Sequence, residues 1–109
     1  MKKYCLMLDL YDDPKLIEEY ENYHKAVWPE IKDSIRRSGI REMQIYRLGT
    51  RLCMMITADE NFSFEKKSAE DASNEKVQKW ETLMWKYQKA LPGSKPGEKW
   101  VLAQKIFDL

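Results

Sequence analysis

The sequence predicts an α+β fold in which helices cover one face of an antiparallel β-sheet. Segments with alternating apolar residues occur at the start, in the middle and at the end of the 109-residue chain. Segments with helical spacing separate them, which gives the order β-α-β-β-α-β. This is the order of the ferredoxin-like fold. Because no repeat, low-complexity tract or linker divides residues 1–109, we expect a single domain.

The first part of the chain carries a strand and a helix that proline interrupts. Apolar residues alternate over Lys3–Leu10, which predicts a strand. Asp13 before Pro14 is typical of a helix start. Apolar residues then recur three and four apart, at Leu16, Tyr20, Tyr23, Val27, Ile31 and Ile35. Because Pro29 lacks a backbone donor, we expect a break there and a second short helix that ends before Gly39.

A β-hairpin is predicted next. Residues of Glu42–Leu48 and Leu52–Ala58 alternate, and Gly49 with Thr50 is typical of the tight turn between them. The polar loop 59–61 follows. We expect residues 62–72 to form a short, irregular helix.

The last part of the chain is predicted to form a long helix and a final strand. The helix starts at Asn74 and carries apolar residues at helical spacing, namely Val77, Trp80, Met84, Tyr87 and Leu91. Proline, glycine and serine mark residues 92–97 as a loop. Trp100–Phe107 then has the pattern of a strand.

Composition and charge limit the classes of partner. The net charge is +1 and the charged residues of both signs are interspersed, so neither nucleic acid nor an anionic membrane is an expected partner. No apolar run is long enough to span a bilayer. The first residues lead directly into a strand rather than a signal sequence, so we expect a cytoplasmic protein. Cys5 and Cys53 lie in strand-like runs without CxxC spacing, which favours small buried side chains over a zinc site or a thiol nucleophile.

Two strands are apolar on both faces. In the first strand Tyr4, Leu6 and Leu8 alternate with Cys5 and Met7, and the strand at 52–58 shows the same pattern. A sheet with one face in water should carry polar residues on that face. We therefore expect a homodimer in which two copies pack sheet to sheet as a dimeric α/β barrel.

His24 is the only histidine and the first candidate for acid–base chemistry, because no other unperturbed side chain titrates near neutral pH. It lies one turn after Tyr20 on the apolar stripe of the predicted helix, so a structural role stays open. Trp80, Met84 and Tyr87 share a face of the other long helix, where Glu81 follows Trp80. If both helices cover one sheet, these side chains converge on a pocket that suits a neutral polyhydroxylated ligand.

The residues around these candidates form a longer pattern. It comprises Glu19-Tyr20, His24, Val27-Trp28-Pro29-Glu30-Ile31, Gly39, Ile45-Tyr46, Val77-Gln78-Lys79-Trp80, Met84 and the strand that ends at Phe107. In this pattern the chain resembles the L-rhamnose mutarotase family over nearly its whole length. The resemblance implies a dimeric ferredoxin-like fold and an isomerase of the aldose 1-epimerase type that acts on a monosaccharide. It also implies that His24 is the proton donor and that Tyr20 and Trp80 contact the sugar.

Two positions depart from the family pattern. This chain has Met43 in the second strand, where the family often has a sugar-contacting tyrosine, and Glu81 where it often has a second tryptophan. We expect Met43 and Glu81 to form part of the substrate wall and to alter sugar preference. Overall resemblance favours L-rhamnose, with L-fucose as the near alternative.

The implied reaction opens and recloses a sugar ring. It needs one proton at the ring oxygen and removes one from the anomeric hydroxyl, which an imidazole can do without a metal or an organic cofactor. Tyr20, Glu81 or water remain as the second proton-transfer group. A dimeric-barrel oxygenase and a non-catalytic binding module, in which His24 is structural, are the alternatives from other classes.

Overall fold

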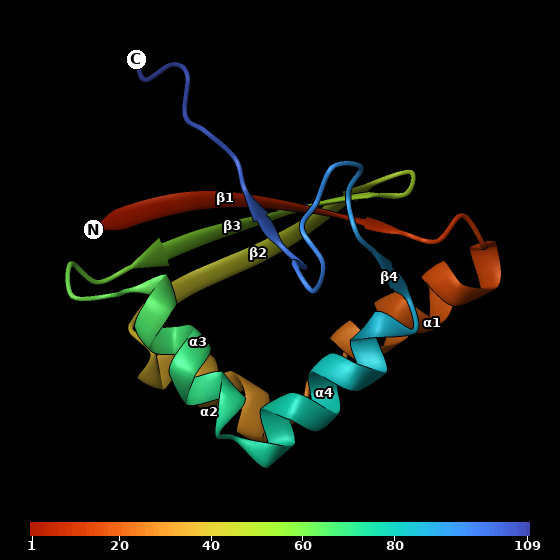
Figure 1. The fold of residues 1–109 in the computed structure, drawn as a ribbon, viewed down its shortest axis with the longest axis horizontal. Helices are drawn as coiled ribbons and strands as arrows, with labels where there is room; N and C mark the ends of the chain where they lie inside the picture. Colours follow the sequence, from red (N-terminus) through yellow and green to blue (C-terminus); the bar gives the residue numbers. More distant parts are fainter.

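A computed structural model describes residues 1–109 and places all helices on one side of a single antiparallel sheet (Figure 1). The elements are β1 (Lys2–Leu10), α1 (Pro14–His24), α2 (Pro29–Arg37), β2 (Ile40–Leu48), β3 (Arg51–Ala58), α3 (Phe64–Ala72), α4 (Glu75–Trp85), β4 (Gln88–Lys89) and β5 (Val101–Leu102). The predicted α+β class with an antiparallel sheet is confirmed. No helix has both the length and the apolar character that a bilayer crossing requires.

The sheet has the order β2-β3-β1-β4, and β5 also pairs with β1. β1 and β3 form the centre, with Lys2 opposite Ala58 at one end and Asp9 opposite Arg51 at the other. β4 pairs with the end of β1 at Asp9 and Leu10, whereas β5 pairs with its middle. The two short strands therefore share one edge of β1.

Local sequence explains where the first two helices begin and end. The Asp13 side chain caps α1 by accepting hydrogen bonds from the backbone N–H groups of Lys15 and Leu16. The expected break is present, because α1 ends before Pro29 and α2 begins at it. After α2 the chain reverses at Gly39, whose φ of 103° is unfavourable for other residues.

The core lies between the helices and the sheet in two apolar clusters. One joins α1, α2 and α4 to the sheet through Leu10, Tyr20, Ile31, Leu52, Val77, Trp80, Met84 and Tyr87. The other lies over the opposite part of the sheet and contains Leu6, Ile40, Met54, Ile56, Ala58 and Phe62. Trp100 packs against both clusters, so the chain after the loop 92–97 closes the core.

The long helix is shorter than its apolar spacing predicts. α4 ends at Trp85, and Tyr87 lies beyond the helix although its ring is buried. Gln88 and Lys89 form β4, which the sequence did not predict. Just past β1 the Tyr11 N–H donates to the Tyr87 carbonyl oxygen, and this pairing with the end of β1 prevails over helical continuation.

Two further predicted boundaries were wrong. The last strand spans only Val101–Leu102 instead of Trp100–Phe107, because residues 103–109 leave the sheet and run away from the helices (Figure 1). Ile106 and Phe107 are exposed there. The helix expected to be irregular is a regular α3 that starts at Phe64 with Ser63 as its cap.

The face of the sheet away from the helices carries sulfur-containing and aromatic side chains. We call Cys5, Met7, Tyr46, Cys53 and Met55 the open face. The Cys5 and Cys53 sulfurs lie 3.4 Å apart, and each lies within 4 Å of a methionine sulfur. Both cysteines are half-buried rather than fully buried. Burial and the neighbouring Cys5 raise the pKa of the Cys53 thiol, so it stays protonated.

Candidate active site

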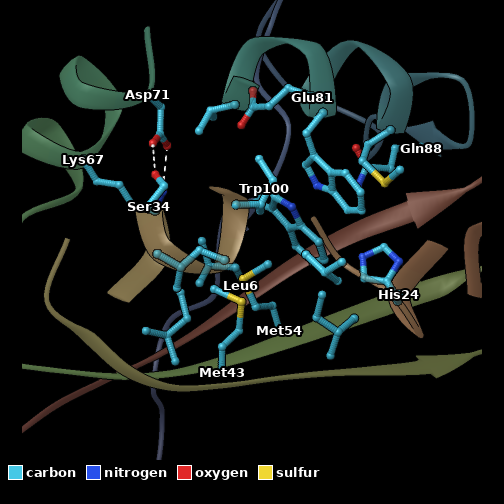
Figure 2. A pocket seen from close by; sticks show the side chains of 18 of the residues that line it. Leu6, His24, Ser34, Met43, Met54, Lys67, Asp71, Glu81, Gln88 and Trp100 are labelled. Carbon is cyan, nitrogen blue, oxygen red and sulfur yellow. Dashed lines mark hydrogen bonds and ion pairs between the residues drawn. The ribbon is translucent and has the colours of Figure 1, made fainter. Parts of the chain in front are cut away.

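A cavity of about 330 Å³ lies between the helices and the sheet (Figure 2). Of its 20 lining residues, 14 are hydrophobic, which is typical of small-molecule sites. All five residues that the sequence singles out contribute to its wall, namely Tyr20, His24, Met43, Trp80 and Glu81. They come from α1, β2 and α4, so the predicted convergence of the two helix faces over one sheet is present.

His24 is the last residue of α1 and is half-buried. Its Nδ1 lies 2.9 Å from the backbone oxygen of Tyr20, one turn earlier in the helix. Because a carbonyl oxygen can only accept, Nδ1 carries the proton and the neutral ring has its lone pair on Nε2. Burial lowers the pKa of His24 below 6.5, and the bond to Tyr20 opposes this only in part. At neutral pH the group is therefore a base.

Tyr20 is buried, with 3% of its surface exposed, and its ring packs on that of His24 at a centroid distance of 4.4 Å. Its hydroxyl accepts a hydrogen bond of 3.1 Å from Nε2 of Gln88. Burial raises the pKa of Tyr20 to about 12, so the phenol keeps its proton at neutral pH. The hydroxyl hydrogen is then free to be donated to a ligand.

Trp80 forms the aromatic wall next to the imidazole. Its ring meets those of His24 and Trp28 edge to face, at centroid distances of 5.8 and 5.1 Å. Tyr23 contacts it from α1 in the same way. These contacts fix the indole from several sides, and such fixed rings are suited to stack against the C–H face of a sugar.

Met43 and Glu81 are the other two predicted site residues in the wall, one apolar and one charged. Met43 is half-buried on β2. The Glu81 carboxylate is 44% exposed and lies 4.0 Å from Nζ of Lys99. Burial lowers the pKa of Lys99, and the nearby Glu81 charge raises it in part. Glu81 is thus a rim carboxylate with a cation nearby.

A second polar group lies at the other end of the cavity from His24 and Gln88 (Figure 2). Asp71 accepts hydrogen bonds from Lys67 at 2.7 Å and from Ser34 at 3.4 Å. The three side chains satisfy one another and tie α2 to α3. Their arrangement is therefore explained by the fold without a ligand.

Sequence reasoning missed two prominent residues of the cavity, Gln88 and Trp100. Gln88 is polar, so the apolar spacing of the helix that was predicted there did not single it out. Trp100 was assigned to the last strand without a site role, because only the long return of the loop 92–97 brings it under the helices. Tyr87, which shares the apolar spacing of Trp80 and Met84, does not line the cavity and instead donates a hydrogen bond of 3.2 Å to Glu19.

The wall offers the imidazole base, the rim carboxylate of Glu81, further hydrogen-bonding groups and aromatic rings. These features suit proton transfer on an uncharged, hydroxylated molecule. No three His, Cys, Asp or Glu side chains gather anywhere in the structure in a way that could hold a metal ion.

Comparison with known proteins places the chain in a family. The family model described as L-rhamnose mutarotase matches residues 3–109. The chain is 49% identical to the L-fucose mutarotase of Xanthomonas campestris pv. campestris, a match that covers all of this chain and 89% of the relative. It is 29% identical to the L-rhamnose mutarotase of Bacteroides thetaiotaomicron over 80% of this chain and 82% of that protein.

A solved structure agrees with the fold. The crystal structure of an L-rhamnose mutarotase from Formosa agariphila superposes with a TM-score of 0.74, over all of this chain and 99% of the other. Its sequence identity is 19%, so this likeness bears on the fold alone. On the match of the family model over residues 3–109, the chain belongs to the L-rhamnose mutarotase family.

Proposed function

We propose that this single-domain protein is an isomerase that interconverts the α and β anomers of a free 6-deoxy-hexose. The observation that carries the proposal is a neutral imidazole of fixed tautomer in the wall of an apolar, aromatic cavity. Family membership supports the same reaction. All groups that the reaction needs are proton-transfer and hydrogen-bonding groups, so the proposal includes no cofactor and no metal.

The chemistry follows from the state of His24. Nε2 takes the proton of the anomeric hydroxyl while the bond between C1 and the ring oxygen breaks and a C1 aldehyde forms. The ring oxygen receives a proton from the imidazolium, from Glu81 or from water. The open chain turns about the C1–C2 bond, and the reversed steps close the ring as the other anomer. Because its pKa is about 12, Tyr20 acts as a hydrogen-bond donor rather than as the base.

We assign the substrate wall to four residues. Trp80 stacks on the sugar ring, Tyr20 donates to a hydroxyl, and Glu81 accepts from a hydroxyl at the rim. Met43 gives an apolar surface for the 6-methyl group. Their common position around the cavity supports these roles.

For the identity of the sugar we favour L-fucose over L-rhamnose. The family resemblance alone favoured L-rhamnose, but the chain is more similar to the L-fucose mutarotase, at 49% identity, than to the L-rhamnose mutarotase, at 29%. Met43 and Glu81, which depart from the pattern of the rhamnose enzymes, also support a different preference.

Exchange between anomers, measured by NMR saturation transfer over a panel of sugars, tests the function. We expect faster exchange for L-fucose than for L-rhamnose, and little for D-glucose, which carries a hydroxyl at C6. Binding without faster exchange would indicate a non-catalytic module. Absence of sugar binding would contradict the mutarotase proposal and favour a dimeric-barrel oxygenase.

We also propose that the protein is a homodimer joined through the open face. Tyr46 and Met55 of that face are 60% and 38% exposed, and its other side chains are only half-buried. A second copy packed sheet to sheet would cover them and complete a dimeric α/β barrel.

A further inference from the structure

Gln88 is the only polar or charged residue among the 16 buried residues of the chain, with 3% of its surface exposed. It lies in β4 opposite Leu10, directly after the buried Tyr87. Buried positions are rarely polar unless the polar group has partners. The short β4 strand therefore holds an amide in the cavity wall at a cost that the fold itself does not explain.

Only half of this amide has a partner. Nε2 donates to the Tyr20 hydroxyl at 3.1 Å, whereas Oε1 has no hydrogen-bond partner. An unsatisfied buried acceptor is costly, because the group has lost its hydrogen bonds to water and gained none in return. The polar group at the other end of the cavity is different, because Ser34, Lys67 and Asp71 satisfy one another.

We infer that Gln88 is a sugar-binding residue, whose free amide oxygen accepts a hydrogen bond from a substrate hydroxyl while its amide nitrogen holds the Tyr20 hydroxyl in position. This inference rests on the proposed function and extends it. The terminal amide torsion of glutamine is broad, so a small rotation brings Oε1 to the hydroxyl without breaking the contact with Tyr20. The substrate then supplies the partner that the empty cavity lacks.

The chemistry of this position selects the class of ligand. An amide oxygen accepts from a neutral hydroxyl and repels a carboxylate or a phosphate. Lys67, the one lysine in the wall, is already paired with Asp71 at the other end of the cavity. We therefore expect free sugars to bind there, and sugar acids and sugar phosphates to be rejected.

The test combines one variant with a set of deoxy sugars. Gln88→Met keeps the length of the side chain and removes both hydrogen bonds, and we expect kcat/KM for anomer exchange to fall about tenfold, as for loss of one or two neutral hydrogen bonds. For the one analogue that lacks the hydroxyl bound by Oε1, wild type should lose about as much and the variant nearly nothing further. Ser94→Ala is the control, because Ser94 Oγ is the other buried atom without a partner and lies outside the cavity; its kinetics should be unchanged.

The possible outcomes separate the two proposals. If every deoxy sugar loses the same factor in wild type and in Gln88→Met, the Gln88 inference is wrong although the enzyme is a mutarotase. If wild type binds sugar without accelerating anomer exchange, the proposed reaction is wrong. The Gln88 inference is then tested by comparing the sugar affinities of wild type and Gln88→Met over the same deoxy sugars. If Gln88→Met does not fold, the side-chain amide signals of Gln88 in labelled wild type decide the matter. They should shift on addition of L-fucose, and unchanged signals at saturation would overturn the inference.

Discussion

The imidazole of His24 is held by an interaction within its own helix. The Tyr20 carbonyl oxygen that accepts from Nδ1 lies one turn before the end of α1, which spans Pro14–His24. This contact holds the ring against its own helix and fixes which nitrogen can take a proton. A structural role and a catalytic role for His24 are therefore compatible.

The role of His24 is testable by substitution. His24→Gln keeps a hydrogen-bonding side chain but cannot exchange protons, so we expect anomer exchange to fall at least about a hundredfold with the fold intact. Exchange is measured by NMR, and folding by circular dichroism. Lys25→Gln, at the exposed neighbouring position, is the matched control and should exchange normally. Near-normal exchange in folded His24→Gln would leave only the structural role.

The depressed pKa of His24 predicts a pH dependence with a definite sign. Exchange that begins with the neutral imidazole should be constant from about pH 8 to 6.5 and should decline only below the ordinary pKa of histidine, 6.5. Stability should also decline as the pH falls. Because the unfolded chain binds this proton more readily than the folded chain, the free energy of unfolding falls as pH drops below 6.5. A rate that instead rises toward pH 5 would show that the imidazolium is the required form.

At the scale of elements, the cap of α4 supports the site indirectly. The Asn74 side chain accepts from the backbone N–H groups of Lys76 and Val77, and α4 carries Trp80 and Glu81. Asn74→Ala should lower the free energy of unfolding by about 1 kcal/mol, measured by urea denaturation. Exchange by the folded fraction should not change, and Asn74→Asp should retain most of the stability. A loss of anomer exchange without a loss of stability would contradict the view that the cap acts only through the stability of α4.

The elements also show how far sequence patterns reach. Helical spacing and proline placement predicted α1, the break before α2 and the shared face of Tyr20 and His24, because those features depend on residues close in the chain. Gln88 and Trp100 depend instead on pairing with β1 and on the path of the loop 92–97. Local periodicity carries no information about such distant contacts. For this reason Gln88 and Trp100 could not be predicted as cavity residues.

At the scale of the whole molecule, the uncovered sheet predicts assembly. We expect light scattering to give the mass of a dimer at micromolar concentration. Met55→Lys, which places a charge on the open face, should yield a monomer. Thr82→Lys adds the same charge on the exposed side of α4 and should leave the dimer intact. A monomeric wild type would show that no second copy covers the open face.

The contacts of Trp80 have an optical consequence. An indole that touches an imidazole loses emission when the ring becomes an electron-accepting imidazolium, and Trp80 lies edge to face with His24. Trp28 contacts Trp80, and Trp100 lines the same cavity, so three of the four tryptophans sense this region. Intrinsic fluorescence should therefore report both the titration of His24 and the arrival of a sugar, without any added label.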